Sequence, residues 1–281
     1  MPQLEWRIYE AGYCTHSEWA TNRNGSLRAC EFPALVSMLT HPVQGIILFD
    51  TGYSRHFLRA TSRFPEYLYR VVTPVHLDLT AAVSIQLERD GIPASNVAWI
   101  VISHFHGDHV GGLGDFPDAK LACSREAWQD MQNRSRVGAL SKGLLPGLVD
   151  AKAESRLQWF EDFPVVELDG PLARFGKAYD LFGDRSLLMI ALPGHAAGHF
   201  GLLFEHRDGP VFLIADASWS SQGVRDLSPP PGVVTAWLGD TKIYRKTLAL
   251  LNALHHEAPH IRIMPSHCLE WRPEKAAITD A

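Results

Sequence analysis

One junction in this chain constrains its fold and its chemistry more than any other: an apolar strand that runs directly into histidines. Residues 97–102 are continuously apolar, and Ser103 leads from them into His-Phe-His-Gly-Asp-His at 104–109. An apolar run of strand length without polar alternation is typical of a strand covered on both faces. We therefore expect an interior β-strand with four metal-ligand-type side chains at its end.

The spacing within 104–109 is suited to holding cations. Side chains two residues apart project to one side of an extended chain, so His104 and His106 can contact one ion. Asp108 and His109, one turn further on, can face a second. Solvated loop histidines are the alternative, but four ligand-type side chains within six residues favour a metal site.

The distribution of histidine and cysteine agrees with this hypothesis. Six of the 14 histidines fall in three short stretches, at 104–109, 195–199 and 267, each beside Gly, Asp or Ser. The four cysteines lie far apart and include no Cys-x-x-Cys pair, so neither a disulfide framework nor a thiolate zinc site is indicated. Cys268 follows His267 directly, and in an extended segment its side chain would turn the other way.

Charge and hydropathy limit the partners. The 281 residues carry a net charge of -5, which disfavours attraction to nucleic acid and to anionic membranes. The amino terminus has no apolar stretch behind it, and no run approaches the ~18 apolar residues of a membrane helix. We expect a soluble, cytoplasmic protein with a small-molecule substrate, no nucleic-acid partner and no membrane partner, and we leave its oligomeric state open.

The remaining pattern predicts two halves in which strands come first and a helix later. The first half has a hairpin within 34–50, a helix at 81–90, the strand at 97–103, a strand at 119–123 and a helix from about 125. The second half has strands at 165–168, 187–192, 201–205, 211–215 and 261–264 and a helix at 240–255. Two similar sheets faced by helices are the natural packing, in a single domain over residues 1–281. The segment 132–165 stays undefined.

The motif at 104–109 resembles the signature of the metallo-β-lactamase superfamily, which has the same His-x-His-x-Asp-His order after a buried strand. Members of that family also have a Pro-Gly-His turn, an aspartate after a later strand and a last histidine near the carboxyl end. This chain offers Pro193-Gly194-His195, Asp216 after 212–215, and His267 after 263–266. The resemblance implies an α/β fold, a four-layer αβ/βα sandwich of two mixed sheets flanked by helices.

The resemblance also implies a dinuclear metal centre. One divalent ion would be held by three histidines, the other by an aspartate and two histidines, and a second aspartate would bridge them. Imidazole and carboxylate ligands make zinc the default ion, with iron, manganese or cobalt left open. The implied metal ligands are His104, His106 and His195 for the first ion, Asp108, His109 and His267 for the second, and Asp216 as the bridge.

The implied activity is hydrolysis of a lactone or small carboxylic ester, with a metal-bridging hydroxide as nucleophile and Asp108 as the catalytic proton donor. The phrases Leu-Phe-Asp-Thr-Gly, Pro-Gly-His-x-x-Gly-His and Asp-Ala-Ser are most similar to quorum-quenching N-acyl-homoserine lactone lactonases. A thioesterase of the hydroxyacylglutathione hydrolase type is the alternative, although only 14 residues follow His267, where such enzymes usually have a helical domain. A non-catalytic ligand-binding effector on the same fold is a third hypothesis.

Three residues and one segment leave the site incompletely defined. Asp50 is either a turn residue or a hydrogen-bond acceptor for a ligand histidine. His199 resembles a structural family histidine, so it is given no metal role. Trp219 stands where related lactonases often have a tyrosine, and an indole cannot transfer a proton. The apolar but irregular segment 135–160 is either core or an acyl-binding loop, with Leu144 as the residue that would separate the two.

Overall fold

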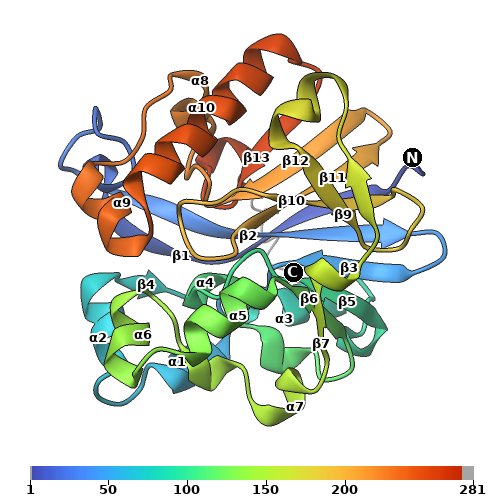
Figure 1. Ribbon diagram of the computed structural model, residues 1–281. Helices are drawn as coiled ribbons and strands as arrows, with labels where there is room; N and C mark the ends of the chain where they lie inside the picture. The colour runs from blue at the N-terminus through green and yellow to red at the C-terminus, as the bar shows by residue number, and fades with distance from the viewer. Residues whose placement is uncertain (1, 274–281) are drawn as a thin grey trace, which may run out of the picture.

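The computed structural model describes residues 2–273 and has four layers. Two mixed β-sheets lie face to face, and helices cover the outer face of each (Figure 1). The first sheet has seven strands and is built from the amino-terminal half, whereas the second has six and comes from the carboxyl-terminal half. The αβ/βα sandwich expected from the sequence is therefore confirmed.

The first sheet joins a long antiparallel hairpin to three parallel strands. β1 and β2, each 13 residues long, pair antiparallel, and β3 continues the antiparallel run before β5, β6 and β7 add in parallel. The hairpin expected within 34–50 is present, but β2 begins earlier, and its partner β1 was not predicted at all. The strand order is β4 (Val75–His76), β1 (Glu5–Ser17), β2 (Ala29–His41), β3 (Gly45–Phe49), β5 (Val97–Val101), β6 (Lys120–Cys123) and β7 (Leu157–Trp159).

The second sheet is antiparallel except at one edge, where β12 and β13 run in parallel. All five strands predicted in this half are present within a residue or two of their expected bounds, and β9 is additional. The strand order is β13 (Arg262–Pro265), β12 (Gly209–Ala215), β11 (Phe200–His206), β10 (Leu187–Ala191), β9 (Lys177–Asp180) and β8 (Val165–Glu167).

Short helices cover both sheets, and one long helix, α10, covers the second. None of the helices within residues 2–273 combines the length and apolarity needed to cross a bilayer. The helices are α1 (Arg55–Ala60), α2 (Tyr67–Val72), α3 (Val83–Arg89), α4 (Gly107–Val110), α5 (Arg125–Gln132), α6 (Arg136–Ser141), α7 (Ala151–Glu154), α8 (Ser221–Arg225), α9 (Gly232–Leu238) and α10 (Thr241–Glu257).

The position of β5 explains why its sequence does not alternate between apolar and polar residues. Ile100 points into the cluster between the first sheet and its helices, whereas Trp99 and Val101 point into the cluster between the two sheets. All three are buried, because both faces of β5 are covered. The prediction of a strand buried on both sides is confirmed, and the chain leaves its end directly into His104.

The segment 135–160, left open by the sequence, has two roles. Leu144, Leu145, Leu148 and Phe160 are buried in the hydrophobic core, whereas α6 at its start reaches the cavity described below. Leu144 is therefore a poor probe of an acyl pocket, since a charge there would disrupt the core. The neighbouring Leu140, half-buried and facing the cavity, is the better probe.

One close backbone contact fixes the loop after β10. Gly194 has a φ of 125°, and a Cβ at this position would overlap the backbone of Tyr244 in the first turn of α10. Only glycine lets this loop approach the helix so closely, and His195 is the next residue along the chain.

We expect Gly194→Ala to destabilise the protein by about 3 kcal/mol or more, because it adds steric overlap to a left-handed backbone. Gly91→Ala is the matched control, since Gly91 has a φ of 76° but a Cβ added there would meet no atom within 4 Å. It should cost about 1 to 2 kcal/mol. Denaturant unfolding of both variants measures the difference, and equal losses would contradict this account of the loop.

Candidate metal centre

Four separate segments bring seven polar side chains to one edge of the sandwich. His104 follows β5, and His106, Asp108 and His109 lie at the start of α4. The other three come from the second half: His195 follows β10, Asp216 follows β12 and His267 follows β13. Since β12 and β13 are parallel, their carboxyl ends lie together, and the two sheets contribute their strand ends to the same place.

The first group consists of three imidazoles and one carboxylate. The Nδ1 atom of His106 lies 3.0 Å from Nε2 of His104 and 3.1 Å from Nε2 of His195. Nε2 of His195 is also 3.3 Å from Oδ2 of Asp216. All four side chains are buried, and one ligand atom from each lies within 4.8 Å of the others.

The second group contains Asp108, His109 and His267. Nε2 of His267 lies 3.3 Å from Oδ2 of Asp108 and 3.2 Å from Oδ1 of Asp216. Nε2 of His109 is 3.3 Å from the same Asp216 oxygen. Asp216 thus turns one oxygen to each group, which is the arrangement expected of a bridging carboxylate.

The donor set fits divalent cations. Ligands placed 2.0–2.1 Å from a tetrahedral zinc ion are about 3.3 Å apart, close to the 3.0–3.3 Å separations of the first group. The nitrogen of His106 contacts those of both other histidines, and three neutral imidazoles that converge in this way offer lone pairs to a cation. In addition, His109 Nε2 and Asp216 Oδ1 are buried without a hydrogen-bond partner among the described residues. Buried polar atoms are rarely left in this state, so a bound ion accounts for both.

Other side chains hold the ligand histidines in place. His109 Nδ1 donates to Asp50 Oδ2 at 2.7 Å, and Asp50 also accepts from the backbone N–H and the hydroxyl of Ser103. His267 Nδ1 donates to the carbonyl of Pro33 at 2.8 Å. These contacts orient the opposite ring nitrogens towards the cluster. Of the two interpretations of Asp50, the structure supports the acceptor.

His199 and Cys268 lie next to the cluster without joining it. His199 donates from Nδ1 to the carbonyl of Leu192 and accepts the backbone N–H of Asp216 at Nε2, so both ring nitrogens are used. Cys268 Sγ contacts the backbone N–H and hydroxyl of Ser221. His199 therefore positions Asp216, and neither residue is available as a ligand.

Burial and charge set the protonation of the two groups differently. Burial lowers the pKa of His106 to about 4 and those of His104 and His195 well below the usual value, so these rings are neutral at pH 7. At His109, burial is outweighed by the charges of nearby aspartates, Asp216 first, which raise its pKa to about 10. The first group therefore already has the neutral form that binds metal.

A cavity of about 340 Å³ opens over the cluster and is mostly apolar. Trp219 forms part of its wall, with its ring packed against those of His195 and His267 at centroid distances of 6.1 and 5.9 Å. The other lining residues come mainly from three helices: Leu68, Tyr69 and Val72 of α2, Val137, Leu140 and Ser141 of α6, and Trp237 and Leu238 of α9.

Tyr69 is a site residue that the sequence did not reveal. It lines the cavity together with Asp108 and Asp216, and its ring packs edge-on against Phe57 at 5.3 Å. Burial and the charge of Asp108 raise the pKa of its hydroxyl well above the usual value, so Tyr69 is a neutral donor. The only signal in the sequence was an aromatic, partly helical stretch after residue 52.

The chain matches the family model of the metallo-beta-lactamase superfamily over residues 31–258. An N-acyl homoserine lactonase of Bacillus cereus is 27% identical over 191 residues, which are 67% of this chain and 66% of that protein. A probable metallo-hydrolase of Mycobacterium tuberculosis is 30% identical over 184 residues, 64% of this chain and 55% of that protein. The chain thus matches less than two thirds of the length of either relative.

A solved structure of an N-acyl homoserine lactone hydrolase, with the product N-hexanoyl-L-homoserine at its catalytic metal centre, has the same fold. The TM-score is 0.73 at 19% identity, over 96% of this chain and 95% of that one. At this identity the likeness concerns the fold alone.

Because Asp216 contacts both groups, we expect its loss to lower the metal content more than the loss of a ligand from one group. Elemental analysis of protein purified without chelator should find about two divalent metals per chain. His106→Ala should retain about one, because it removes a ligand of one group only, whereas Asp216→Ala should fall below one. His56→Ala is the control, since His56 pairs with Asp115 outside the cluster. Equal losses in His106→Ala and Asp216→Ala would contradict the bridging role.

Proposed function

Since the chain belongs to the metallo-beta-lactamase superfamily, we propose that it is a metal-dependent hydrolase of a lactone or small carboxylic ester. The observation that carries the proposal is the double cluster: seven ligand-type side chains in two groups, sharing one carboxylate, at the base of an apolar cavity. His104, His106 and His195 would hold one ion, Asp108, His109 and His267 the other, and Asp216 both. Bound divalent ions would supply Lewis-acid polarisation of a carbonyl and a water molecule of lowered pKa.

Water is the best-supported nucleophile, because the cavity offers no activated side chain among the described residues. The hydroxyl of Ser141 donates to the carbonyl of Gly138 in its own helix, away from any base. Burial raises the pKa of the Cys14 thiol to about 12, so Cys14 is not a thiolate at neutral pH. Within residues 2–273 neither side chain forms a hydrogen bond to a base, as the activated nucleophile of covalent catalysis does.

Asp108 would move a proton to the leaving group. Its carboxylate lies at the floor of the cavity, 12% exposed, with His267 Nε2 at 3.3 Å. A carboxylate in this place can take a proton from the attacking water and deliver it to the departing oxygen. An alkoxide needs this proton more than a thiolate does, since the alkoxide is the poorer leaving group.

Tyr69 would provide the hydroxyl that Trp219 cannot. Its O–H lies near the Asp108 carboxylate at the cavity floor, where it can turn to donate to the carbonyl oxygen of a bound substrate. This donation would stabilise the negative charge that develops on that oxygen during attack. Related lactonases often have a tyrosine where this chain has Trp219. Here Tyr69, from the other half of the chain, would donate the hydrogen bond instead.

The apolar walls favour a substrate with a hydrophobic acyl portion. Leu68, Val72, Leu140 and Trp237 line the space above the cluster, whereas the clustered His and Asp side chains lie at its floor. A neutral ring or ester at the floor with an apolar chain among the helices matches this division. The related lactonase from Bacillus cereus acts on N-acyl homoserine lactones, by its name, and such compounds are the first substrates to test. In its most specific form, the proposal is a zinc-dependent lactonase that acts in quorum quenching.

Matched oxygen and sulfur substrates test the reaction type. We expect the metal-loaded protein to hydrolyse acyl lactones, incorporating one ¹⁸O atom from labelled water. Asp108→Asn should slow lactones and oxygen esters about 100-fold or more and the corresponding thioesters much less, because an amide cannot pass a proton. Faster turnover of thioesters than of lactones by the unmodified protein would favour the thioesterase alternative. No turnover of any substrate would favour the non-catalytic effector.

A second test isolates the Tyr69 hydroxyl. Tyr69→Phe should lower kcat for lactones by about 100-fold, with melting temperature and metal content unchanged, because only one hydrogen-bond donor is removed. Tyr67→Phe is the matched control: the same change on the same helix, at a residue that is 41% exposed and does not line the cavity. Equal rates for both variants would exclude Tyr69 from the reaction.

A further inference from the structure

An exposed apolar group of side chains, called the collar here, lies on the helices that line the cavity, and Val72, Val137 and Trp237 of this group line the cavity itself. Six side chains on α2, α6, α9 and the turn before α2 are each between 60 and 70% exposed, although all are large and apolar. Single exposed apolar residues are common, but a group around one opening is not. The collar consists of Phe64, Val71, Val72, Val137, Val233 and Trp237.

These elements form one surface. Figure 1 shows α2, α6 and α9 gathered at one end of the molecule, and all three line the same cavity. The last two are tied together across the mouth: Lys142 donates to the carbonyl of Trp237, and the Trp237 indole donates to the carbonyl of Ser141. The collar therefore spans both halves of the chain.

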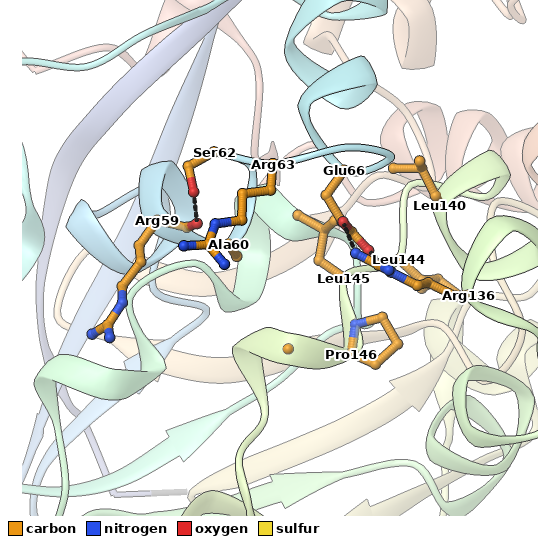
Figure 2. Close-up of a pocket in the computed structure, with 11 residues that line it drawn as sticks. Arg59, Ala60, Ser62, Arg63, Glu66, Arg136, Leu140, Leu144, Leu145 and Pro146 are labelled. Carbon is orange, nitrogen blue, oxygen red and sulfur yellow. Dashed lines mark hydrogen bonds and ion pairs between the residues drawn. The ribbon is translucent and has the colours of Figure 1, made fainter.

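A basic hollow adjoins the collar. It has a volume of about 500 Å³ and is lined by Arg59, Arg63 and Arg136, with Leu140 shared between it and the cavity. Figure 2 shows Arg59 and Arg63 on one side of the hollow and the Arg136–Glu66 pair on the other. Arg136 is neutralised by Glu66 at 2.6 Å, whereas Arg59 and Arg63 form no ion pair within residues 2–273.

The local charge is opposite in sign to that of the whole chain. The segment 55–72 contains four arginines and a single acidic residue, Glu66, and it remains positive after Arg55 is paired with Asp115, within a protein of net charge -5. The overall charge led us to expect no attraction to anionic membranes. The distribution of charge favours such attraction at this one face, because screening limits electrostatic effects to about 8–10 Å.

We propose that this face docks onto an anionic lipid surface. Phe64, Val71 and Trp237 would enter the boundary between headgroups and acyl chains, and Arg59 and Arg63 would contact lipid phosphates. A second copy of the chain fits less well, since a two-fold interface would bring the unpaired arginines of both copies together without acidic partners. Docking places the cavity mouth against the bilayer, where an amphiphilic substrate can enter from the lipid.

Vesicle sedimentation tests the proposal without any substrate. Metal-loaded protein is mixed with vesicles of phosphatidylcholine alone or with about 30% phosphatidylglycerol. We expect binding to the anionic vesicles only, weakening as sodium chloride is raised from about 50 to about 300 mM. Val71→Asp and Arg63→Glu should each lower the partition coefficient by about tenfold.

Two variants outside the collar serve as controls. Val43→Asp changes a residue that is 81% exposed in the turn between β2 and β3, and Arg207→Glu changes an arginine in the turn between β11 and β12. Both should bind vesicles as the unmodified protein does. Circular dichroism and metal content check that all four variants are folded.

Three results would overturn the proposal: no binding to anionic vesicles, equal loss in test and control variants, or a dimer in solution that Val71→Asp converts to a monomer. The last would assign the collar to a second copy. Because no step of this experiment involves turnover, a failure to bind vesicles would not contradict the proposed hydrolase activity. Likewise, a lack of hydrolase activity would not contradict membrane docking.

Discussion

The two halves of the molecule meet at the carboxylate of Asp216. This side chain is buried at the end of β12, with one oxygen facing His195 and the other facing His109 and His267. A buried carboxylate needs positive charge or donors around it, and here the imidazoles of His109, His195 and His267 face its two oxygens. His199 holds its backbone N–H, so even a structural histidine serves to fix this residue.

Several features of the backbone hold the segments around Asp216 in place. β5 delivers His104 directly, because a strand buried on both faces cannot bend or shift without exposing Trp99 or Ile100. Gly194 lets the loop of His195 lie against α10, and Asp50 adopts a φ of 61° while it accepts from His109 and Ser103. The backbone strain at Asp50 is offset by hydrogen bonds from His109 and Ser103, next to the cluster.

Sequence reasoning succeeded where the signal is short and chemical. The motif at 104–109, the Pro-Gly-His turn and the two late strand ends indicated seven residues that do lie together. It failed where the signal depends on distant partners: β1 alternates too weakly to be recognised without β2, and Leu144 and Leu140 are equally apolar although one is core and the other faces the cavity. Tyr69 could not be found, because only the fold brings α2 to Asp108.

The proposed hydrolysis requires two metal ions acting together on one substrate. Titration of the metal-free protein with Co²⁺ tests this most directly, with visible absorption and lactone hydrolysis followed on the same samples. We expect absorption to saturate at two equivalents per chain and hydrolysis to rise mainly with the second. Saturation at one equivalent, or full cobalt loading without hydrolysis of any lactone or ester, would contradict the account.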